Sequence, residues 1–284
     1  MMATGMSKAA RGTAVAAETA SATGTGVPTS STTLTGRALA LGRAELTLLG
    51  RNKTALYMTL FMPALMIWAM RSGAQKLDLS RSGMSLKEAT MTGAFGYVLI
   101  FVVYYNLMSV YTARREELVL KRLRTGEAGD LEILAGTALP SAAITLAQCV
   151  LLVTAGTAWL DMRAPARPEL LLAGVLLGLV MLAALAAAST AMARTSETAQ
   201  LAGMPLAMVS MLGSGMFWPL EAMPDVLANA CELLPMTPVV GLMRDGWLGG
   251  ADVSETLGHL AAALVWTALA VFAVRRWFRW EPRR

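Results

Sequence analysis

The chain has 284 residues, of which 55% are hydrophobic and only 15% are charged, and its mean hydropathy is +0.53. Soluble domains usually carry about 25% charged residues, so this composition indicates a membrane protein. The net charge of +5 does not indicate a nucleic-acid partner, because the Lys and Arg residues follow membrane topology and no nucleic-acid-binding motif interrupts the apolar segments.

The first 33 residues are rich in Ala, Thr, Ser and Gly and contain almost no large apolar side chains. Such a segment cannot offset its ordering entropy by burial, so we expect residues 1–33 to form a disordered tail. The tail also lacks the apolar run of about 7 to 15 residues that a signal peptide needs, and no cleavage is expected.

Residues 34–53 combine leucines at a spacing of seven with Arg37, Arg43 and Arg51. This pattern favours a helix that lies in the headgroup layer of the membrane. Glu45 falls on the apolar side of that helix, and an ordinary solvated helix is the alternative.

Long stretches without charge predict the membrane-spanning helices, each of which needs roughly 20 mostly apolar residues. The sequence therefore predicts an all-α membrane protein with six transmembrane helices in a domain that covers residues 34–284. The predicted spans are about 54–70, 91–112, 139–160, 170–193, 199–218 and 256–274.

The distribution of Lys and Arg predicts the orientation of these spans, because positive residues are enriched in cytoplasmic loops. With the N-terminus inside, the inner segments hold 17 of the 24 Lys and Arg residues and the outer segments hold 7. Both termini are therefore predicted to be cytoplasmic.

A dense charged run, RREELVLKRLR from Arg114 to Arg124, follows the second predicted span on the cytoplasmic side. Glu117 precedes Lys121 by four residues, a spacing that stabilises a helix by about 0.2 to 0.5 kcal/mol. Val119 and Leu123 give the run an apolar side. Mixed charges with an apolar pair favour a surface that binds another protein, and the alternative is a basic cluster that binds anionic lipid.

The last predicted outer segment, residues 219–255, is too patterned to be a plain loop. Between Pro224 and Pro235 the apolar residues fall on one helical face, which predicts a short amphipathic helix. The following apolar run, 233–243, is too short to span a membrane and contains Pro235 and Pro238. We therefore expect a re-entrant or interfacial excursion between the fifth and sixth spans.

The sequence offers little chemistry of its own. The spans contain one ionisable candidate, His259, which we interpret as a packing or hydrogen-bonding group and not as a proton relay. Cys149 and Cys231 have no partners at metal-ligand spacing and are interpreted as packing residues. The chain has no H-E-x-x-H motif and no Walker-type loop, so we expect no enzyme activity, no bound cofactor or metal, and an energy source in another subunit.

Two motifs in order resemble those of a known family. RREELVLKRLRTGE (114–127), followed by ALPS (138–141), is similar to the segment between the second and third spans of ABC-2 type permeases, the membrane subunits of bacterial ABC exporters. GMFWPLEAMP (215–224) with LLPMTP (233–238) resembles the segment between that family's fifth and sixth spans. The likeness is greatest to the drug-export branch typified by the daunorubicin exporter permease and covers roughly residues 35–280.

The resemblance implies that two permease copies, expected to be identical, form the path and that two ABC ATPase subunits, which bind ATP and Mg²⁺, dock from the cytoplasm. It makes the charged run the coupling helix that contacts the ATPase, although its C-terminal end is left open because GEAGDLEILAGTAL (126–139) precedes Pro140. The coupling residues are then Arg115, Glu116, Glu117, Leu118, Val119, Lys121, Arg122, Leu123, Arg124 and Glu127.

By the same resemblance, the re-entrant segment closes the path on the outer side. The gate residues are then Phe217, Pro219, Glu221, Met223, Pro224, Pro235, Thr237 and Pro238. Methionines that recur along single helix faces are candidates for the substrate path, since Met suits varied apolar ligands, and packing or lipid-facing roles are the alternative. These candidates are Met58, Met62 and Met66 in the first span and Met204, Met208 and Met211 in the fifth.

The function that we expect is the permease subunit of an ATP-driven ABC exporter in a bacterial cell membrane, in contact with membrane lipids. Its cargo would be hydrophobic or amphipathic small molecules such as antibiotics. The alternatives are a permease for a lipid-linked glycan or lipid, and a membrane scaffold or sensor without transport activity.

Overall fold

The structure, a computed structural model, describes residues 86–118, 129–159, 162–193, 195–216, 220 and 223–278. All of them belong to one unit of the chain, Ala38–Arg284. The predictions for the tail, the interfacial helix and the first span, with Met58, Met62 and Met66, lie outside the described residues.

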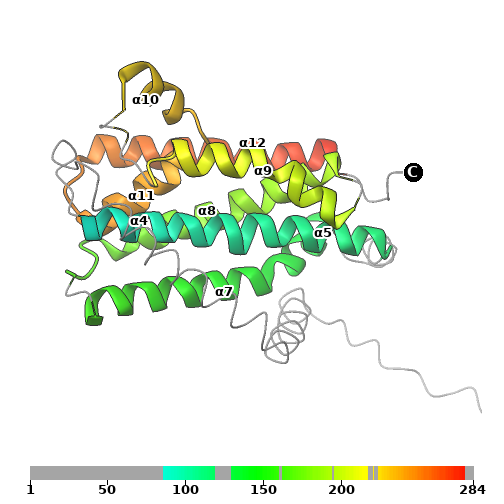
Figure 1. Cartoon of the computed structure of the whole chain (residues 1–284), viewed down its shortest axis with the longest axis horizontal. Helices are drawn as coiled ribbons and strands as arrows, with labels where there is room; N and C mark the ends of the chain where they lie inside the picture. Colours follow the sequence, from blue (N-terminus) through cyan, green and yellow to red (C-terminus); the bar gives the residue numbers. More distant parts are fainter. Residues whose placement is uncertain are drawn as a thin grey trace, which may run out of the picture. The chain divides into compact units, whose positions relative to one another are not determined.

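The described residues form helices and no strand, which confirms the all-α prediction (Figure 1). One continuous helix consists of α4 (Leu86–Val98), a π-helical stretch η1 (Leu99–Tyr105) and α5 (Asn106–Glu116). The other elements are α7 (Asp130–Trp159), α8 (Pro168–Ser189) with its 3-10 extension η2 (Thr190–Met192), α9 (Ser196–Gly213), α10 (Asp225–Glu232), α11 (Met236–Leu248) and α12 (Val253–Trp277).

Within the described ranges, four helices are long and apolar enough to cross a membrane: Lys87–Glu116, Asp130–Ala158, Pro168–Met192 and Val253–Trp277. They correspond to the second, third, fourth and sixth predicted spans. Helix α9, at the position of the predicted fifth span, begins with polar residues and is not among the four. The count of six spans therefore stays a prediction.

Helices α10 and α11 lie where the re-entrant excursion was predicted. Together they are long and apolar enough for one span, but they are bent by 95° at the break between them. Pro235 lies at this break, where a missing N–H and a fixed φ end one helix and begin the next.

Helix α7 begins at Asp130, earlier than the predicted start at residue 139. The ALPS motif therefore lies inside α7, and Pro140 is a helix-internal proline. Most of the segment before Pro140 is therefore helical and continuous with the predicted third span, and the end of the predicted coupling helix stays a prediction.

The π-helical stretch η1 places polar groups against neighbouring helices in the middle of the second span. The Tyr104 hydroxyl donates to Ser189 Oγ of α8 at 3.1 Å. Just beyond η1, the Asn106 amide donates to Ser141 Oγ of α7 at 2.9 Å. Polar side chains in a membrane pair across helices in this way, and these bonds tie η1 to α8 and α5 to α7.

Helix α8 lies at the centre of the packing, in contact with α5, α7, α9, α11 and α12. Its two spaced glycines allow this closeness: a Cβ at Gly174 would lie 2.8 Å from Met243 Cγ, and one at Gly178 would lie 2.7 Å from Val239 Cγ1. The G-x-x-x-G pattern therefore serves packing. Helix α11 is buried along almost its whole length.

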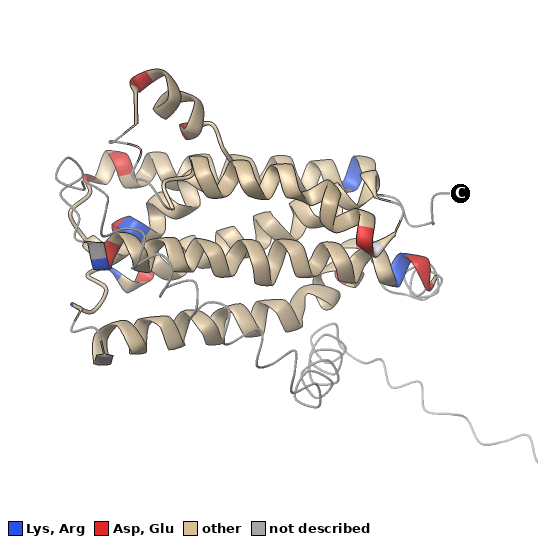
Figure 2. Cartoon of the chain, in the orientation of Figure 1, with Lys and Arg blue, Asp and Glu red and all other residues tan. Residues whose placement is uncertain are grey.

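Charged residues gather at the two ends of the spanning helices and leave their middles uncharged (Figure 2). One end, here called the Glu116 end, holds the last turns of α5 and α12, η2, and the first turns of α7 and α9. The other, the Arg163 end, holds the loop 162–167, the end of α11 and the start of α12. The sequence predicts the Glu116 end to be cytoplasmic.

Candidate functional site

The first candidate site is the turn that follows α5 at the Glu116 end. Glu117 caps the helix by donating its N–H to Ala113 O at 3.0 Å, and Leu118 has a φ of 59°. The positive φ of Leu118 is incompatible with a continuing right-handed helix, and it is unfavourable for a leucine. The helix therefore ends at this turn. Glu116, Glu117 and Leu118 are exposed. The described part of the charged run therefore leaves the helical path of α5 at Leu118.

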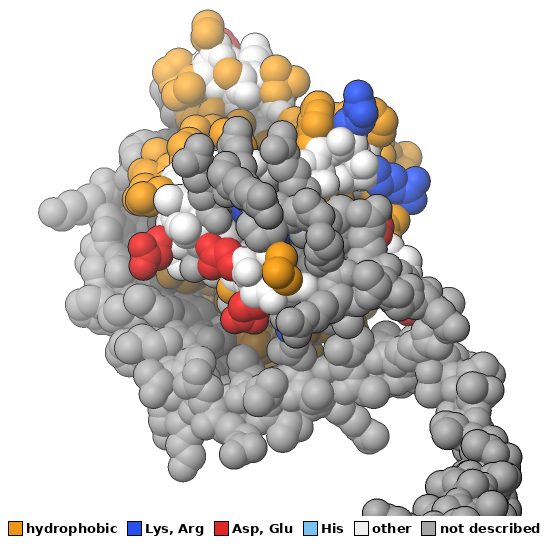
Figure 3. Space-filling view, turned by 90° about the vertical axis from the view of Figure 1, so that its right-hand side faces the viewer, with side chains coloured by type: hydrophobic (Ala, Val, Ile, Leu, Met, Phe, Trp, Pro, Cys, Tyr) orange, Lys and Arg blue, Asp and Glu red, His pale blue; other side chains and the backbone are white. Residues whose placement is uncertain are grey.

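The other predicted coupling residues, Val119, Lys121, Arg122, Leu123, Arg124 and Glu127, lie outside the described residues. Figure 3 faces the Glu116 end and shows that acidic, basic and hydrophobic side chains of the described residues share this surface. The described part of the end thus carries both charge signs, as does the predicted docking segment itself.

Arg115 does not lie on this surface. Its side chain is 1% exposed, and its guanidinium donates to Thr190 O at 2.9 Å and to Ala193 O at 2.6 Å. Both acceptors are carbonyls at the C-terminal end of α8 and η2, where a positive charge is favourable. This corrects the predicted placement of Arg115: it anchors the end of α5 to the connection between α8 and α9.

Helix α9 begins directly after that connection and packs on α5. Its first turn is held by a reciprocal cap between Thr195 and Thr198. Gln200 donates to Ser109 Oγ of α5 at 3.1 Å, and a Cβ at Gly203 would lie 2.5 Å from Met108 Sδ. Through these contacts, the end of α5, the end of α8 and the start of α9 form one tightly connected group.

The predicted methionine candidates on α9 divide between two faces. Met204 and Met208 are 50% and 49% exposed, beside Leu201 and Leu212, whereas Met211 packs against the core. The exposed side of α9 is therefore a continuous apolar surface to which Met204 and Met208 belong and Met211 does not.

The second candidate site is a polar cavity of about 580 Å³ at the Arg163 end. It opens between α10, α11 and α12, and carboxylates, one arginine and one histidine line it. Its lining residues are Ser214, Gly215, Leu220, Met223, Asp225, Ala228, Asn229, Glu232, Thr237, Val240, Gly241, Arg244, Glu255 and His259.

Five of the eight predicted gate residues surround the bend beside this cavity. Met223 and Thr237 line it, and Thr237 donates to Cys231 O at 2.6 Å, which joins the end of α10 to the start of α11. Pro224 precedes α10, while Pro235 and Pro238 begin α11. The other three, Phe217, Pro219 and Glu221, lie outside the described residues.

The apolar side of α10 does not face the core. Val226 is 85% exposed and Leu233, its C-cap, is 74% exposed, whereas Cys231 is buried without a disulfide bond. Cys149 is likewise buried and free, so both cysteines pack as the sequence indicates. The amphipathic helix exists as predicted, but its apolar residues point away from the other described helices.

His259 and the buried Asp245 form a pair that joins α12 to α11 beside the cavity. His259 Nδ1 lies 2.9 Å from Asp245 Oδ2. Gly241 makes room for the ring, since a Cβ there would lie 2.7 Å from His259 Cε1. The sequence interpretation of His259 as a hydrogen-bonding group agrees with this geometry, but it missed the partner. The available signal was an aspartate in a mostly apolar segment, four residues after a glycine.

The end of α11 is fixed by the neighbouring loop. Gly249 ends the helix with a φ of +74°, a conformation that favours glycine. The N–H groups of Ala166 and Arg167 donate to Trp247 O and Gly246 O at 3.2 and 2.9 Å. These bonds satisfy the last carbonyls of α11 and hold its end against the start of α8.

Comparison with known proteins identifies this arrangement. The sequence profile described as ABC-2 type transporter matches residues 37–248, which include the described helices from α4 to α11. No curated protein shows significant sequence similarity to the chain. The multi-pass helices, the charged turn after the second span and the bent helix pair are thus parts of a transporter membrane domain, and the chain belongs to the ABC-2 type transporter family.

Proposed function

We propose that this chain is the permease subunit of an ATP-driven exporter in a bacterial cell membrane, and that it moves hydrophobic or amphipathic small molecules outward. ATP and Mg²⁺ are bound by a separate ABC ATPase subunit, a partner that membership of the family implies. The observation that carries the proposal is the exposed turn Glu116–Leu118, which the buried Arg115 links to the connection between α8 and α9.

This link can transmit a movement of the ATPase to the transmembrane helices. A partner that docks on the segment after α5 moves the end of the second span. Because Arg115 holds carbonyls of Thr190 and Ala193, the ends of the fourth span and the start of α9 move with it. Packed helices transmit such shifts as rigid elements, so docking at the Glu116 end reaches the bundle without any contact to cargo.

The exposed apolar side of α9 is the proposed surface toward the path and toward an identical second permease copy. Flexible and branched apolar side chains lie there, from Leu201, Met204, Met208 and Leu212. Such surfaces accept ligands of varied shape.

The polar cavity at the Arg163 end is the proposed outer exit. Its carboxylates Asp225, Glu232 and Glu255 favour cationic amphiphiles by local electrostatic attraction. Both termini are cytoplasmic in this orientation.

Co-purification in nanodiscs with candidate ABC ATPase subunits from the same cell tests the proposal. We expect a stable complex whose ATPase activity rises with hydrophobic amines. The double variant Glu117→Lys with Arg122→Glu should lose the complex, because it reverses charges on both sides of the docking segment. Arg163→Gln at the opposite end is the matched control and should keep it.

Two results would overturn the proposal. Failure of the wild-type chain to bind any ABC ATPase would leave a scaffold or sensor as the better function. Stimulation by a lipid-linked glycan, together with no response to hydrophobic amines, would replace the proposed cargo while keeping the ATP-driven permease.

A further inference from the structure

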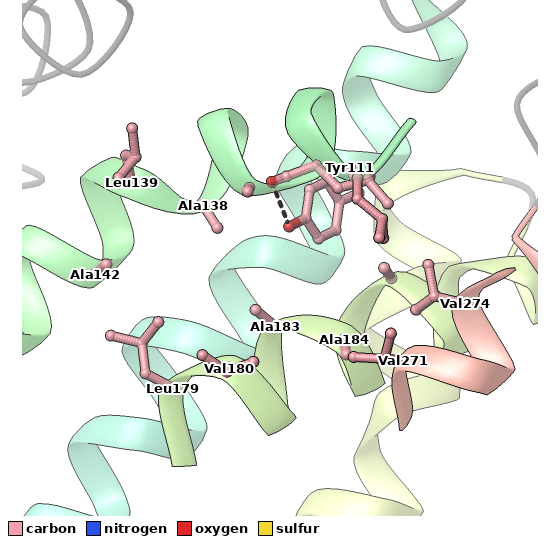
Figure 4. A pocket seen from close by; sticks show the side chains of 14 residues that line it. Tyr111, Ala138, Leu139, Ala142, Leu179, Val180, Ala183, Ala184, Val271 and Val274 are labelled. Carbon is pink, nitrogen blue, oxygen red and sulfur yellow. Dashed lines mark hydrogen bonds between the residues drawn. The ribbon is translucent and has the colours of Figure 1, made fainter. Parts of the chain in front are cut away.

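A second cavity, distinct from the polar one, lies between α5, α7, α8 and α12 and has a volume of about 340 Å³ (Figure 4). Its walls are aliphatic side chains except for one phenol. The lining residues are Tyr111, Leu131, Leu134, Ala135, Ala138, Leu139, Ala142, Leu179, Val180, Ala183, Ala184, Ala187, Val271 and Val274. We call it the alanine groove.

Small side chains create the groove. Alanines at 135, 138 and 142 on α7 and at 183, 184 and 187 on α8 line it from both sides, so the helices leave a space between them. The groove is open sideways, since Leu131, Leu139 and Val180 on its walls are 40%, 37% and 49% exposed. The hydroxyl of Tyr111 donates to Leu134 O at 3.0 Å, so the one polar side chain in the wall already has its partner.

The position of the groove relative to the membrane determines which molecules can fill it. All four helices that form it belong to segments long and apolar enough to cross a membrane, so lipid is the medium that we expect around it. An empty apolar space forfeits dispersion contacts with its walls, and a lipid chain that enters restores them. Since lipid tails are as apolar as leucine, the hydrophobic effect adds little, and selectivity must come from the headgroup.

Helix geometry places Arg275 at the mouth of the groove, next to the lining residues of α12. It follows Val274 directly and lies one helical turn, four residues, after Val271, so it shares their side of α12. Arg276 lies about 100° further around the helix and faces elsewhere. Both arginines are exposed. The rings of Tyr111 and Phe278 are 6.5 Å apart, edge to face, which holds this end of α12 against α5.

Carboxylates also lie at this end of the bundle. Asp130 and Glu132 form the first turn of α7, just before the wall residue Leu134. A mouth with both signs disfavours a multiply charged anion. It suits a headgroup in which a phosphate lies beside an ammonium group, because an arginine contacts the former and a carboxylate the latter.

We propose that the alanine groove binds one chain of a bilayer phospholipid from the leaflet at the Glu116 end, with Arg275 contacting the phosphate and the acyl chain lying against the alanines of α7 and α8. The inference goes beyond the proposed function and does not depend on the cargo or on the ATPase.

Native mass spectrometry of the full-length protein in detergent tests the headgroup contact. The probes are phosphatidylethanolamine and the diacylglycerol with the same chains, which lacks the phosphate. We expect the phospholipid to bind more tightly, and Arg275→Gln to weaken its binding several-fold, because glutamine cannot make the charge-assisted contact to the phosphate, without changing the binding of diacylglycerol. Arg276→Gln is the matched control on the same helix turn and should leave both affinities unchanged. Equal effects of the two substitutions would overturn the assignment of Arg275.

Photo-crosslinking tests the chain site. Phosphatidylethanolamine with a diazirine in its acyl chain should label peptides from residues 131–142 and 179–187. Val180→Trp fills the groove and should abolish that labelling, whereas Leu172→Trp, on the same helix, 52% exposed and outside the groove, should retain it. Both positions are exposed, so neither substitution disturbs the core. Labelling that avoids these peptides in the wild-type protein would overturn the proposal.

Discussion

The guanidinium of Arg115 and the main-chain oxygen of Ala193 are joined by a 2.6 Å hydrogen bond across 78 positions of sequence. With the companion bond to Thr190 O, a charge that begins the predicted docking run is fully buried inside the bundle. The run thus starts as an internal anchor and becomes a surface only from Glu116 onward.

Replacing Arg115 by Gln should therefore destabilise the protein and uncouple it. Hydrogen bonds to charged groups contribute about 1.5 to 3 kcal/mol each, so the loss of both bonds should cost about 3 to 6 kcal/mol, measured by thermal unfolding in detergent. ATPase docking should persist, because the exposed Glu117 is unchanged, while stimulation by cargo is lost. Arg276→Gln removes an exposed arginine from the same end and should do neither. Normal stimulation in Arg115→Gln would contradict the anchoring role.

The contribution of the His259–Asp245 pair to stability can be distinguished from that of the space that Gly241 leaves for the imidazole ring. A double-mutant cycle of Gly241 and His259 does this. Gly241→Ala should cost about 1 to 3 kcal/mol because its Cβ meets the imidazole ring. His259→Ala should cost about 1 to 3 kcal/mol because it removes the partner of a buried carboxylate. Since the clash needs the ring, the double variant should cost less than the sum by about 1 kcal/mol. Additive melting shifts would contradict this geometry.

Two glycines give a matched test of how closely α11 packs against α8. A Cβ at Gly246 would lie 2.8 Å from Leu171 Cα, a backbone atom that cannot move aside, whereas Gly258 has nothing within 4 Å. Gly246→Ala should therefore destabilise the protein by about 1 to 3 kcal/mol. Gly258→Ala should stabilise it by about 0.5 to 1 kcal/mol, since alanine favours a helix interior. Equal shifts in the melting temperatures of the two variants would show that α11 is not held so closely.

The sequence predicts the helices well where hydropathy alone decides. The spans around Phe101, Val150 and Val175 follow from uninterrupted apolar windows, and the bend at Pro235 follows from proline chemistry. It places the start of α7 too late, because Pro140 indicates a helix end when read locally, whereas neighbouring helices and polar groups tolerate an internal proline in a membrane.

The candidate site is less predictable because its contacts depend on which face of a helix points inward. Arg114 and Arg115 are adjacent and identical in type, yet only Arg115 turns toward Thr190. The π-helical stretch η1 rotates the side chains of α5 relative to those of α4. The composition of Leu99–Tyr105 does not predict a π-helix. A rotation of this kind determines that Arg115 contacts the end of α8, whereas Arg114 donates to Thr137 Oγ1 of α7.

The exposed face of α9 offers the last test, since it separates a path residue from a packing residue of the same type. Met208→Trp should lower cargo transport several-fold by crowding the proposed path, with little change in stability, because Met208 is 49% exposed. Met211→Trp should instead destabilise the protein by about 1 to 3 kcal/mol, because Met211 packs against the core. Leu264→Trp on α12, at 50% exposure, is the control for bulk on a lipid-facing surface and should change neither. Transport into proteoliposomes and melting in detergent distinguish the three. If Met208→Trp and Leu264→Trp transport equally well, α9 does not line the path.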